Sequence, residues 1–399
     1  MINSFDGFSD TCSPVSLYIP ESALCKSTHA ANFSCGMRYL VADCGGGTVD
    51  LTVHELEVNG KLKELYKATG GAWGSMGVDC QFEMLLVDIF GEHFLLNFVQ
   101  TYPISWLELI SSFETKKRSF STKKQIPINI SLPFAFTDHL KKLSGKSIES
   151  FVREFEDNGI QWTSQGMLRL QPSVMYSLFE PVVDEVVQHI QRLLDIPELA
   201  PIKYIFLVGG FAESPTLQEA IQKAFQHKLK VIIPHNVSLT ILKGAVMFGQ
   251  DPSLIHVRRS ALTYGVGCLN HFIPGKHPPE KRVIKDGVEW CAGLFDPFVF
   301  ADQAVSLGHT VTRSYTLAQE NKQSTTITVY ASEKESVQYI TDPGCEKVGE
   351  MRLEMPAAVD GQCKELQMTM MFGDTEITVE AVDAISGQTT RASIDFLNK

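Results

Sequence analysis

The sequence lacks the long hydrophobic runs and the paired cysteines that mark membrane, zinc-binding and disulfide-rich proteins. None of its 399 residues falls in an unbroken apolar stretch of about 18 residues, so no membrane span is expected. The nine cysteines are odd in number and form no C-x-x-C pair, which indicates neither a zinc site nor a complete disulfide framework. The first residues, MINSFDGFSDTC, lack the basic and apolar regions of a secretory signal. We therefore expect a protein of the reducing cytoplasm.

Positive charge is also in short supply. The chain has 35 Lys and Arg against 46 Asp and Glu, a net charge of −11, which argues against nucleic-acid binding through its overall field. It contains no G-x-x-x-x-G-K-[ST] loop and no G-x-G-x-x-G that opens a helix, so two common phosphate-binding motifs are excluded. With 44% hydrophobic residues the chain can bury a large core, and at about 150 residues per domain its length predicts two or three domains.

Strand and helix patterns alternate through the first 250 residues. Periodicity predicts strands at 38–43, 49–56, 126–132, 203–208 and 229–234, and helices at 82–90, 105–120, 173–194, 215–226 and 238–249. Ser173 and Ser214 are the expected N-caps of the third and fourth of these helices. This rhythm is typical of an α/β unit in which helices pack on a sheet.

After about residue 258 the pattern changes to short alternating strands separated by Gly, Pro and Asp turns, which is typical of an antiparallel sandwich. Between the two patterns, GQDPSLIHVRRS is a plausible linker because it is polar and contains Gly and Pro. The expected organisation is a leader or remnant at 1–37, an α/β unit at 38–250, a linker at 251–259 and a β-sandwich at 260–399.

The most informative motif is DCGGGTVD at residues 43–50. Three consecutive glycines, here named the glycine turn (residues 45–47), let a backbone approach a charged group and direct N–H donors towards phosphate oxygens. Thr48 adds a hydroxyl donor, and Asp43 and Asp50 are hard oxygen ligands suited to Mg²⁺ or to orienting an attacking water. The alternative is a hairpin turn with two solvated carboxylates.

Cys44 lies inside this motif. Backbone N–H dipoles of the glycine turn are expected to lower the pKa of its thiol. Oxidation or alkylation of Cys44 would then block the site.

A second group of polar residues lies in FETKKRSFS. Glu114, Lys117, Arg118 and Ser121 have the spacing i, i+3, i+4 and i+7, which places them on one face of a helix where a single ligand can contact all four. The alternative is a solvated face with an internal ion pair.

A third motif is LVGG at 207–210, where a predicted strand runs into Gly209 and Gly210 before a helix. These glycines permit a base or ribose to lie against the backbone. An ordinary strand-to-helix turn is the alternative.

The order and spacing of these motifs resemble the actin-like ATPase fold of the 70-kDa heat-shock chaperones. The runs DCGGGTVD, ATGGAWGSMGVD, E-x-x-K-R-x-x-S, LVGGFAESP and KGAVMFG match the second nucleotide-binding lobe over about 38–250. KVGEMRLEMP and ITVEAVDAISGQ resemble the peptide-binding β-sandwich of the family, and ETKKRSF and MFGDTEITVEAVD resemble its divergent 12 subfamily, A or B type. The resemblance therefore implies an α/β actin-like ATPase lobe followed by an all-β sandwich domain.

The resemblance also implies ligands and roles. ATP or ADP with Mg²⁺ would be the cofactor, and client peptides or partner proteins would bind the sandwich. Phosphates would be held by Gly45, Gly46, Gly47 and Thr48, with Asp43 and Asp50 beside Mg²⁺ and the attacking water. The adenosine would be contacted by Glu114, Lys117, Arg118, Ser121, Gly209, Gly210 and Glu213.

Several departures from the family pattern predict weak or absent hydrolysis. The D-x-G-T phosphate loop and the lysine of the first lobe are not found, Ile19 takes the place of a glutamate before Pro20, and Glu213 takes the place of an arginine against the adenine. We also expect no helical lid over the sandwich. Two other readings stay open: a non-catalytic interaction module with a vestigial nucleotide pocket, and a metabolite kinase of the actin-like superfamily, against which the sandwich counts.

Overall fold

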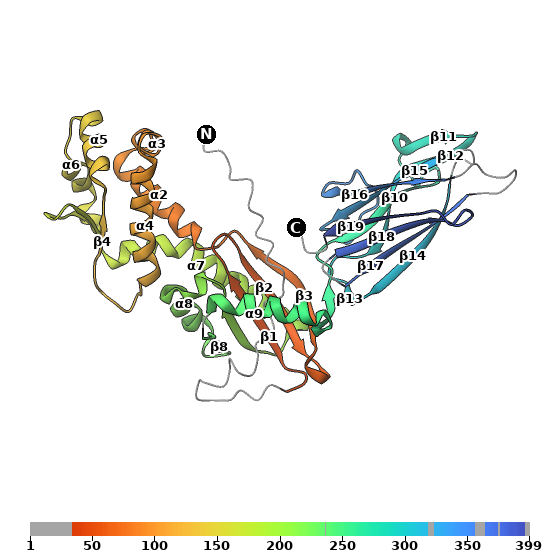
Figure 1. Cartoon of the computed structure of the whole chain (residues 1–399), viewed down its shortest axis with the longest axis horizontal. Coiled ribbons are helices and arrows are strands. Elements are labelled where there is room, and N and C mark those ends of the chain that lie inside the picture. The colour runs from red at the N-terminus through yellow and green to blue at the C-terminus, as the bar shows by residue number, and fades with distance from the viewer. Residues whose placement is uncertain (1–33, 236, 318–322, 356–363, 374–375, 396–399) are drawn as a thin grey trace.

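The chain folds into a mixed helix-and-sheet part and an all-β part, which lie at opposite ends of an elongated molecule (Figure 1). The computed structural model describes residues 34–235, 237–317, 323–355, 364–373 and 376–395. Ile19 and most of the expected leader at 1–37 lie outside these residues. The coarse prediction of an α/β unit followed by a β unit is confirmed.

A seven-stranded mixed sheet forms the centre of the α/β part, in the order β13-β9-β3-β2-β1-β7-β8. Strands β1, β2 and β3 form antiparallel ladders, whereas β7 and β8 continue the sheet in parallel beside β1. The strands are β1 (Arg38–Cys44), β2 (Val49–Leu56), β3 (Leu62–Gly71), β7 (Ile202–Val208), β8 (Lys230–Ile232), β9 (Ile255–Arg259) and β13 (Ala304–Ser306).

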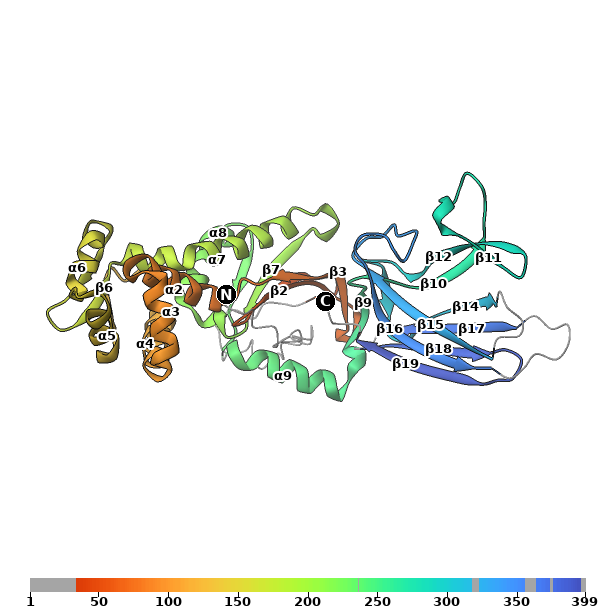
Figure 2. The same cartoon turned by 90° about the horizontal axis from the view of Figure 1, so that it is seen from above.

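Helices cover both faces of this sheet, with α7 (Pro172–Leu194) and α8 (Pro215–Phe225) on one side and α9 (Val237–Gln250) on the other (Figure 2). Alternate residues of β1 therefore enter different cores: Leu40 packs with the α7 and α8 side, and Val41 with the α9 side. Because both faces are buried, the strand is a continuous apolar run.

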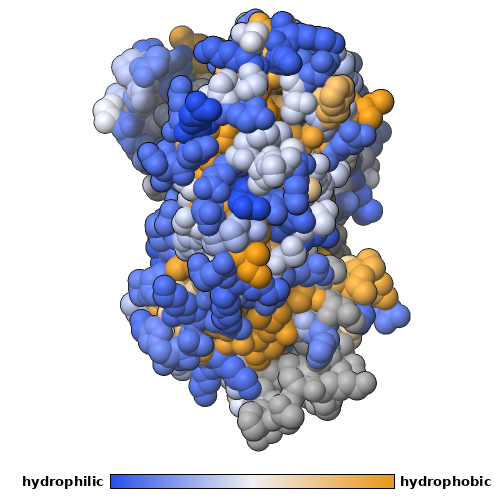
Figure 3. Space-filling model, turned by 90° about the vertical axis from the view of Figure 1, so that its left-hand side faces the viewer, coloured by the Kyte–Doolittle hydropathy of each residue, from blue (hydrophilic) through white to orange (hydrophobic). Residues whose placement is uncertain are grey.

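A helical extension projects from one end of the sheet (Figure 1). It contains α2 (Met76–Phe90), α3 (Glu92–Thr101), α4 (Pro103–Ser119), α5 (Phe134–Ser144), α6 (Ile148–Val152) and a small sheet of β4 (Ile128–Ser131), β6 (Met167–Leu170) and β5 (Ile160–Trp162). Phe82 of α2 stacks on Phe113 of α4 with ring centroids 4.0 Å apart, which joins these helices. Hydrophilic side chains cover most of the end where α5 and α6 lie, with separate hydrophobic areas between them (Figure 3).

Short 3₁₀ helices connect several elements: η1 (Val58–Gly60), η2 (Arg153–Asn158), η3 (Pro197–Leu199), η4 (Phe211–Glu213), η5 (Pro252–Leu254) and η6 (Pro279–Lys281). Within the described residues, no helix has both the length and the apolar character needed to cross a membrane.

Each helix and strand expected before residue 250 is present within a few residues of its expected bounds; Ser214 is the N-cap residue of α8 as predicted, whereas the predicted cap at Ser173 is wrong. Helix α7 begins at Pro172, so Ser173 lies inside it. Ser214 precedes α8, yet its hydroxyl makes no capping bond and is buried without a partner among the described residues. Both helices begin with proline, whose fixed φ and missing N–H reduce the need for a side-chain cap.

The β part is a sandwich of two antiparallel sheets. One has the order β11-β12-β10-β15-β16 and the other β14-β17-β18-β19. Their inward side chains form one core, which includes Val329, Met370 and Val379. The strands are β10 (Thr263–His271), β11 (Arg282–Lys285), β12 (Val288–Val299), β14 (His309–Thr316), β15 (Ser324–Ser332), β16 (Cys345–Glu354), β17 (Glu365–Phe372), β18 (Glu376–Asp383) and β19 (Thr389–Asp395).

The stretch 251–259, expected to be a linker, instead contributes a strand to the central sheet. Strand β9 pairs in parallel with β3 and antiparallel with β13, which comes from beyond the expected boundary. Arg258 is almost fully buried, with its guanidinium 3.8 Å from the Glu64 carboxylate and 5.3 Å from the centre of the Phe248 ring. The backbone ladders with β3 and β13 hold β9 in the sheet, and Glu64 and Phe248 are the neighbours of its buried charge.

Candidate functional site

The glycine turn lies at one end of the central sheet, where β1, β2 and β7 meet. Asp43 pairs with Asp50 across the antiparallel ladder and with Val208 across the parallel one. The turn is closed by a hydrogen bond from the Gly45 N–H to the Thr48 carbonyl at 2.9 Å. Gly209 follows β7 directly, so the first and third motifs of the sequence come together at this edge.

The next glycine-rich segment braces the turn from one side. The N–H groups of Gly74, Ser75 and Met76 donate to the carbonyls of residues 47, 45 and 46 at 3.1, 3.2 and 2.9 Å. A Cβ at Gly74 would lie 2.2 Å from the Gly46 carbonyl oxygen, so only glycine fits there. A Cβ at Gly46 or Gly47 would meet nothing within 4 Å, so the other side of the turn is open to a ligand.

Asp43 is a buried carboxyl at this edge with a strongly raised pKa. It is 6% exposed, and burial first, then the charge of Asp50, raise the pKa of its carboxyl to about 7. Asp50 accepts a hydrogen bond from the Thr48 hydroxyl at 3.2 Å. A divalent cation would offset the repulsion between the two carboxylates. The described residues contain no group of three or more potential ligands, so phosphate or water oxygens would have to complete a Mg²⁺ shell.

The expectation of a reactive Cys44 is wrong. Its side chain is fully buried, and burial, followed by the charges of Asp43 and Asp50, raises the pKa of the thiol well above its ordinary value. The thiol points to the Ala42 carbonyl at 3.9 Å. Two carboxylates and the hydrophobic core outweigh the backbone dipoles that the sequence suggested.

The polar group of α4 is organised around Lys117. Its ammonium is buried and lies 2.7 and 2.8 Å from the two carboxylate oxygens of Asp79 on α2, and 2.5 Å from Glu114. Glu114 also accepts from Arg118 at 2.7 Å, although the Arg118 side chain is 74% exposed. Sequence reasoning missed Asp79, and its position in the first turn of a helix after glycines was the available signal.

Ser121 does not share the helix face of the other three residues, so this part of the prediction is wrong. Helix α4 ends at Ser119, because Phe120 is extended and buried in the core. The Ser121 hydroxyl donates to Glu219 of α8 at 2.8 Å, and the Thr122 N–H donates to the same carboxylate at 3.2 Å. Glu219 was not predicted, since nothing in the local sequence marks it.

Arg118 and Glu213 are near enough for their charges to interact. The hydrogen bond to Glu114 and the charge of Glu114 are the main causes that raise the pKa of Arg118. The charge of Glu213 raises this pKa further. Glu213 is exposed on η4, next to Gly210, where a Cβ would meet nothing within 4 Å. The ends of α4 and η4 therefore lie close together, and Gly210 leaves its neighbourhood open.

These features define a class of protein: a mixed α/β sheet that presents an open glycine turn and two neighbouring carboxylates at one edge, followed by a β-sandwich. No protein-family profile matches the chain. The chain is 50% identical over 368 residues to the heat shock 70 kDa protein 12A of Mus musculus and of Homo sapiens, which covers 91% of this chain and 54% of each relative. It is 49% identical over 378 residues to the heat shock 70 kDa protein 12B of Homo sapiens, which covers 92% of this chain and 55% of that protein.

The chain is thus related to the 12 subfamily of the 70-kDa heat-shock proteins, and the resemblance drawn from its motifs is confirmed. It spans about half the length of these relatives.

Replacing Lys117 tests the buried cluster. We expect Lys117→Met to lower the free energy of unfolding by about 2 kcal/mol, because the partly buried carboxylates of Asp79 and Glu114 lose their shared cation. Arg118→Gln, which removes an exposed cation from the same helix, should change it by less than about 0.5 kcal/mol. Urea unfolding of both variants is the measurement; equal effects would contradict the central role of Lys117.

Proposed function

We propose that the α/β part is an actin-like ATPase lobe that binds ATP or ADP with Mg²⁺, and that hydrolysis by this chain is weak or absent. The observation that carries the proposal is the open glycine turn beside Asp43, Asp50 and Gly209. The relationship to the 12 subfamily of heat-shock proteins supports it.

The glycine turn supplies the phosphate contacts in this proposal. Its carbonyls accept from residues 74–76, whereas the N–H groups of Gly46 and Gly47 donate to nothing within the part of the chain that the structure describes. Two free N–H groups on a turn without side chains suit the oxygens of a phosphate chain. Thr48 adds a hydroxyl at the same edge.

Mg²⁺ would be held by Asp43 and Asp50, through water or directly, and would supply charge neutralisation at the phosphates. The buried position of Asp43 fits this role. Its carboxyl has a raised pKa, and a cation bound beside it would lower that pKa and favour the ionised form. Asp43 in its ionised form, together with Asp50, would orient an attacking water.

Adenosine would lie between the ends of α4 and η4, against Gly209 and Gly210. Glu114, Lys117, Arg118, Ser121 and Glu213 remain the proposed contacts.

A second candidate function is a non-catalytic interaction module with a vestigial nucleotide pocket. The observation that favours it is that two proposed adenosine contacts are already held in ion pairs: Lys117 with Asp79 and Glu114, and Arg118 with Glu114. A nucleotide would have to share or replace these bonds. In both cases we propose that the β-sandwich binds client peptides or partner proteins.

Calorimetric titration of the full chain with ATP and Mg²⁺, with a thermal-shift scan beside it, distinguishes the two. A ligand that binds only the folded state raises its stability by about 2.7 kcal/mol at a hundredfold excess over Kd. We expect saturable binding that Asp43→Ala and Lys117→Ala each weaken at least tenfold, while the exposed control Asp157→Ala leaves it unchanged. No heat of binding at millimolar ATP would favour the interaction module.

A further inference from the structure

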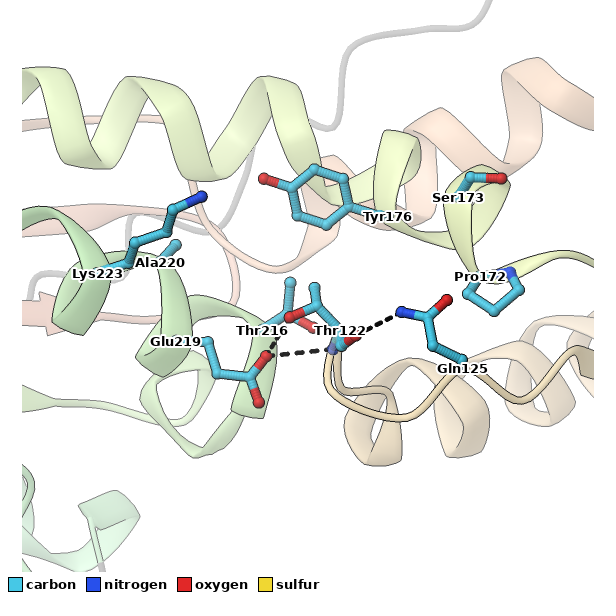
Figure 4. Close-up of a pocket in the computed structure, with 9 residues that line it drawn as sticks. All are labelled: Thr122, Gln125, Pro172, Ser173, Tyr176, Thr216, Glu219, Ala220 and Lys223. Atoms are coloured by element: carbon cyan, nitrogen blue, oxygen red, sulfur yellow. Dashed lines mark hydrogen bonds between the residues drawn. The ribbon is translucent and has the colours of Figure 1, made fainter.

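A cavity of about 380 Å³ lies between the start of α7, the loop after α4 and the outer face of α8 (Figure 4). Its volume is within the range of small-molecule sites in proteins. None of its lining residues belongs to the candidate nucleotide site. The lining consists of Thr122, Gln125, Pro172, Ser173, Tyr176, Thr216, Glu219, Ala220 and Lys223.

The walls of the cavity offer an apolar surface for a flat molecule. The Tyr176 ring and the Pro172 ring come from α7, and Ala220 comes from the facing turn of α8 (Figure 4). Thr216 adds little polarity, because its hydroxyl is buried and already donates to the Phe120 carbonyl at 3.2 Å. An aromatic or short aliphatic body would therefore replace water on these surfaces.

The two charged residues of α8 at this cavity, Glu219 and Lys223, do not form an ion pair with each other. Glu219 and Lys223 have the i, i+4 spacing at which a Glu and a Lys ordinarily pair. Instead, the Glu219 carboxylate turns to Ser121 and to the N–H and hydroxyl of Thr122, whereas Lys223 extends on the Tyr176 side of the cavity (Figure 4). Within the described ranges Lys223 has no ion-pair partner.

The groups left over at this cavity are mainly donors. Besides the Lys223 ammonium, the hydroxyls of Ser173 and Tyr176 make no hydrogen bond to any described residue. Burial first, then the charges of Asp184 and Glu180, raise the pKa of Tyr176, so its hydroxyl stays protonated. The acceptor capacity of Glu219, in contrast, is taken up by three donors from residues 121 and 122.

We infer that this cavity binds a small anion with a flat apolar body, such as an aryl carboxylate or an aryl phosphate. The body packs against Tyr176 and Pro172, and the anionic group lies at the ammonium of Lys223, which is the cation of the cavity lining. No residue of the glycine turn lines this cavity, and the hydrogen bond from Ser121 to Glu219 links it to the proposed nucleotide site.

Phenyl phosphate and benzoate are the probes, titrated into the full chain by calorimetry and by saturation-transfer NMR. We expect both to bind with a Kd in the millimolar range or below, and benzyl alcohol, which has the same ring without the charge, to bind at least tenfold more weakly. Lys223→Gln should weaken both anions at least tenfold. The matched control Lys228→Gln removes another exposed cation just beyond the end of α8 and should leave binding unchanged.

Ala220→Leu tests the location independently, since Ala220 is half-buried in the cavity wall and a larger side chain there would occupy part of the cavity. We expect it to abolish binding of both anions while the melting temperature changes little. The inference is overturned if neither anion binds, if benzyl alcohol binds as tightly, or if Lys223→Gln and Ala220→Leu both leave binding intact. Displacement of phenyl phosphate by ATP would also overturn the inference, because it would show that phenyl phosphate binds at the glycine turn and not in this cavity.

Discussion

Gly209→Ala should be among the most damaging single substitutions in the α/β part. Gly209 has φ +90°, a conformation that L side chains rarely adopt, and a Cβ there would lie 2.4 Å from the Cys44 carbonyl oxygen and 2.5 Å from Asp43 Oδ1. The first contact is with backbone, which cannot rotate away, and the second displaces the candidate Mg²⁺ ligand. We expect the free energy of unfolding to fall by on the order of 3 kcal/mol.

Gly210→Ala is the matched control, because a Cβ at this neighbouring position would meet nothing within 4 Å and its φ is negative. It should change stability by less than about 0.5 kcal/mol. Urea unfolding of both variants, followed by far-ultraviolet circular dichroism, is the measurement. If the two variants prove equally stable, then β7 and β1 do not approach each other as closely as described.

The elements that the sequence predicted well are those whose pattern is local. Strands β1 and β7 contain the apolar runs YLVA and YIFLV and are followed by glycines, and α7 repeats its apolar residues at helical spacing over 23 residues. The parallel register of β1 and β7 places Asp43 opposite Val208 and so beside Gly209, which the local patterns alone did not predict.

What the sequence did not predict depends on contacts between distant segments. Strand β9 carries Arg258, whose charge suggested a linker, and only Glu64 and Phe248 explain how it is buried. In the same way, Lys117 was expected to face a ligand, but its partner Asp79 lies 38 residues away on α2. Helical spacing predicts on which face of a helix a residue lies, but it does not predict which other segment packs against that face.

The end of α4 shows a further limit. The i, i+7 spacing placed Ser121 on the helix, yet the helix stops two residues earlier because burying Phe120 requires an extended backbone. Helix ends are the least certain part of a periodic pattern. The correction matters for function, since it moves Ser121 from a helix face to Glu219, which lines the anion cavity.

Asp43→Asn should stabilise the folded chain at neutral and alkaline pH while it removes the proposed Mg²⁺ contact. The pKa of Asp43 is raised from 3.8 to about 7, so between these values the folded state holds a proton that the unfolded state has released. The free energy of unfolding contributed by this group is therefore highest below pH 4, falls as the pH rises to 7 and is constant above it. The whole change amounts to roughly 4 kcal/mol, at about 1.4 kcal/mol per pKa unit.

Asparagine has the shape of aspartate without its charge, so the variant lacks this pH-dependent cost. The difference in free energy of unfolding between Asp43→Asn and the unsubstituted chain should be small at pH 4 and should grow in favour of the variant by several kcal/mol at pH 8. The control is Asp157→Asn, which removes an exposed carboxylate and should show no such growth. A difference that stays constant from pH 4 to 8 would mean that Asp43 is ionised in the folded chain throughout. A stability gain at pH 8 together with loss of Mg²⁺-dependent ATP binding would show that the chain retains a buried carboxylate at the expense of stability because the ligand requires it.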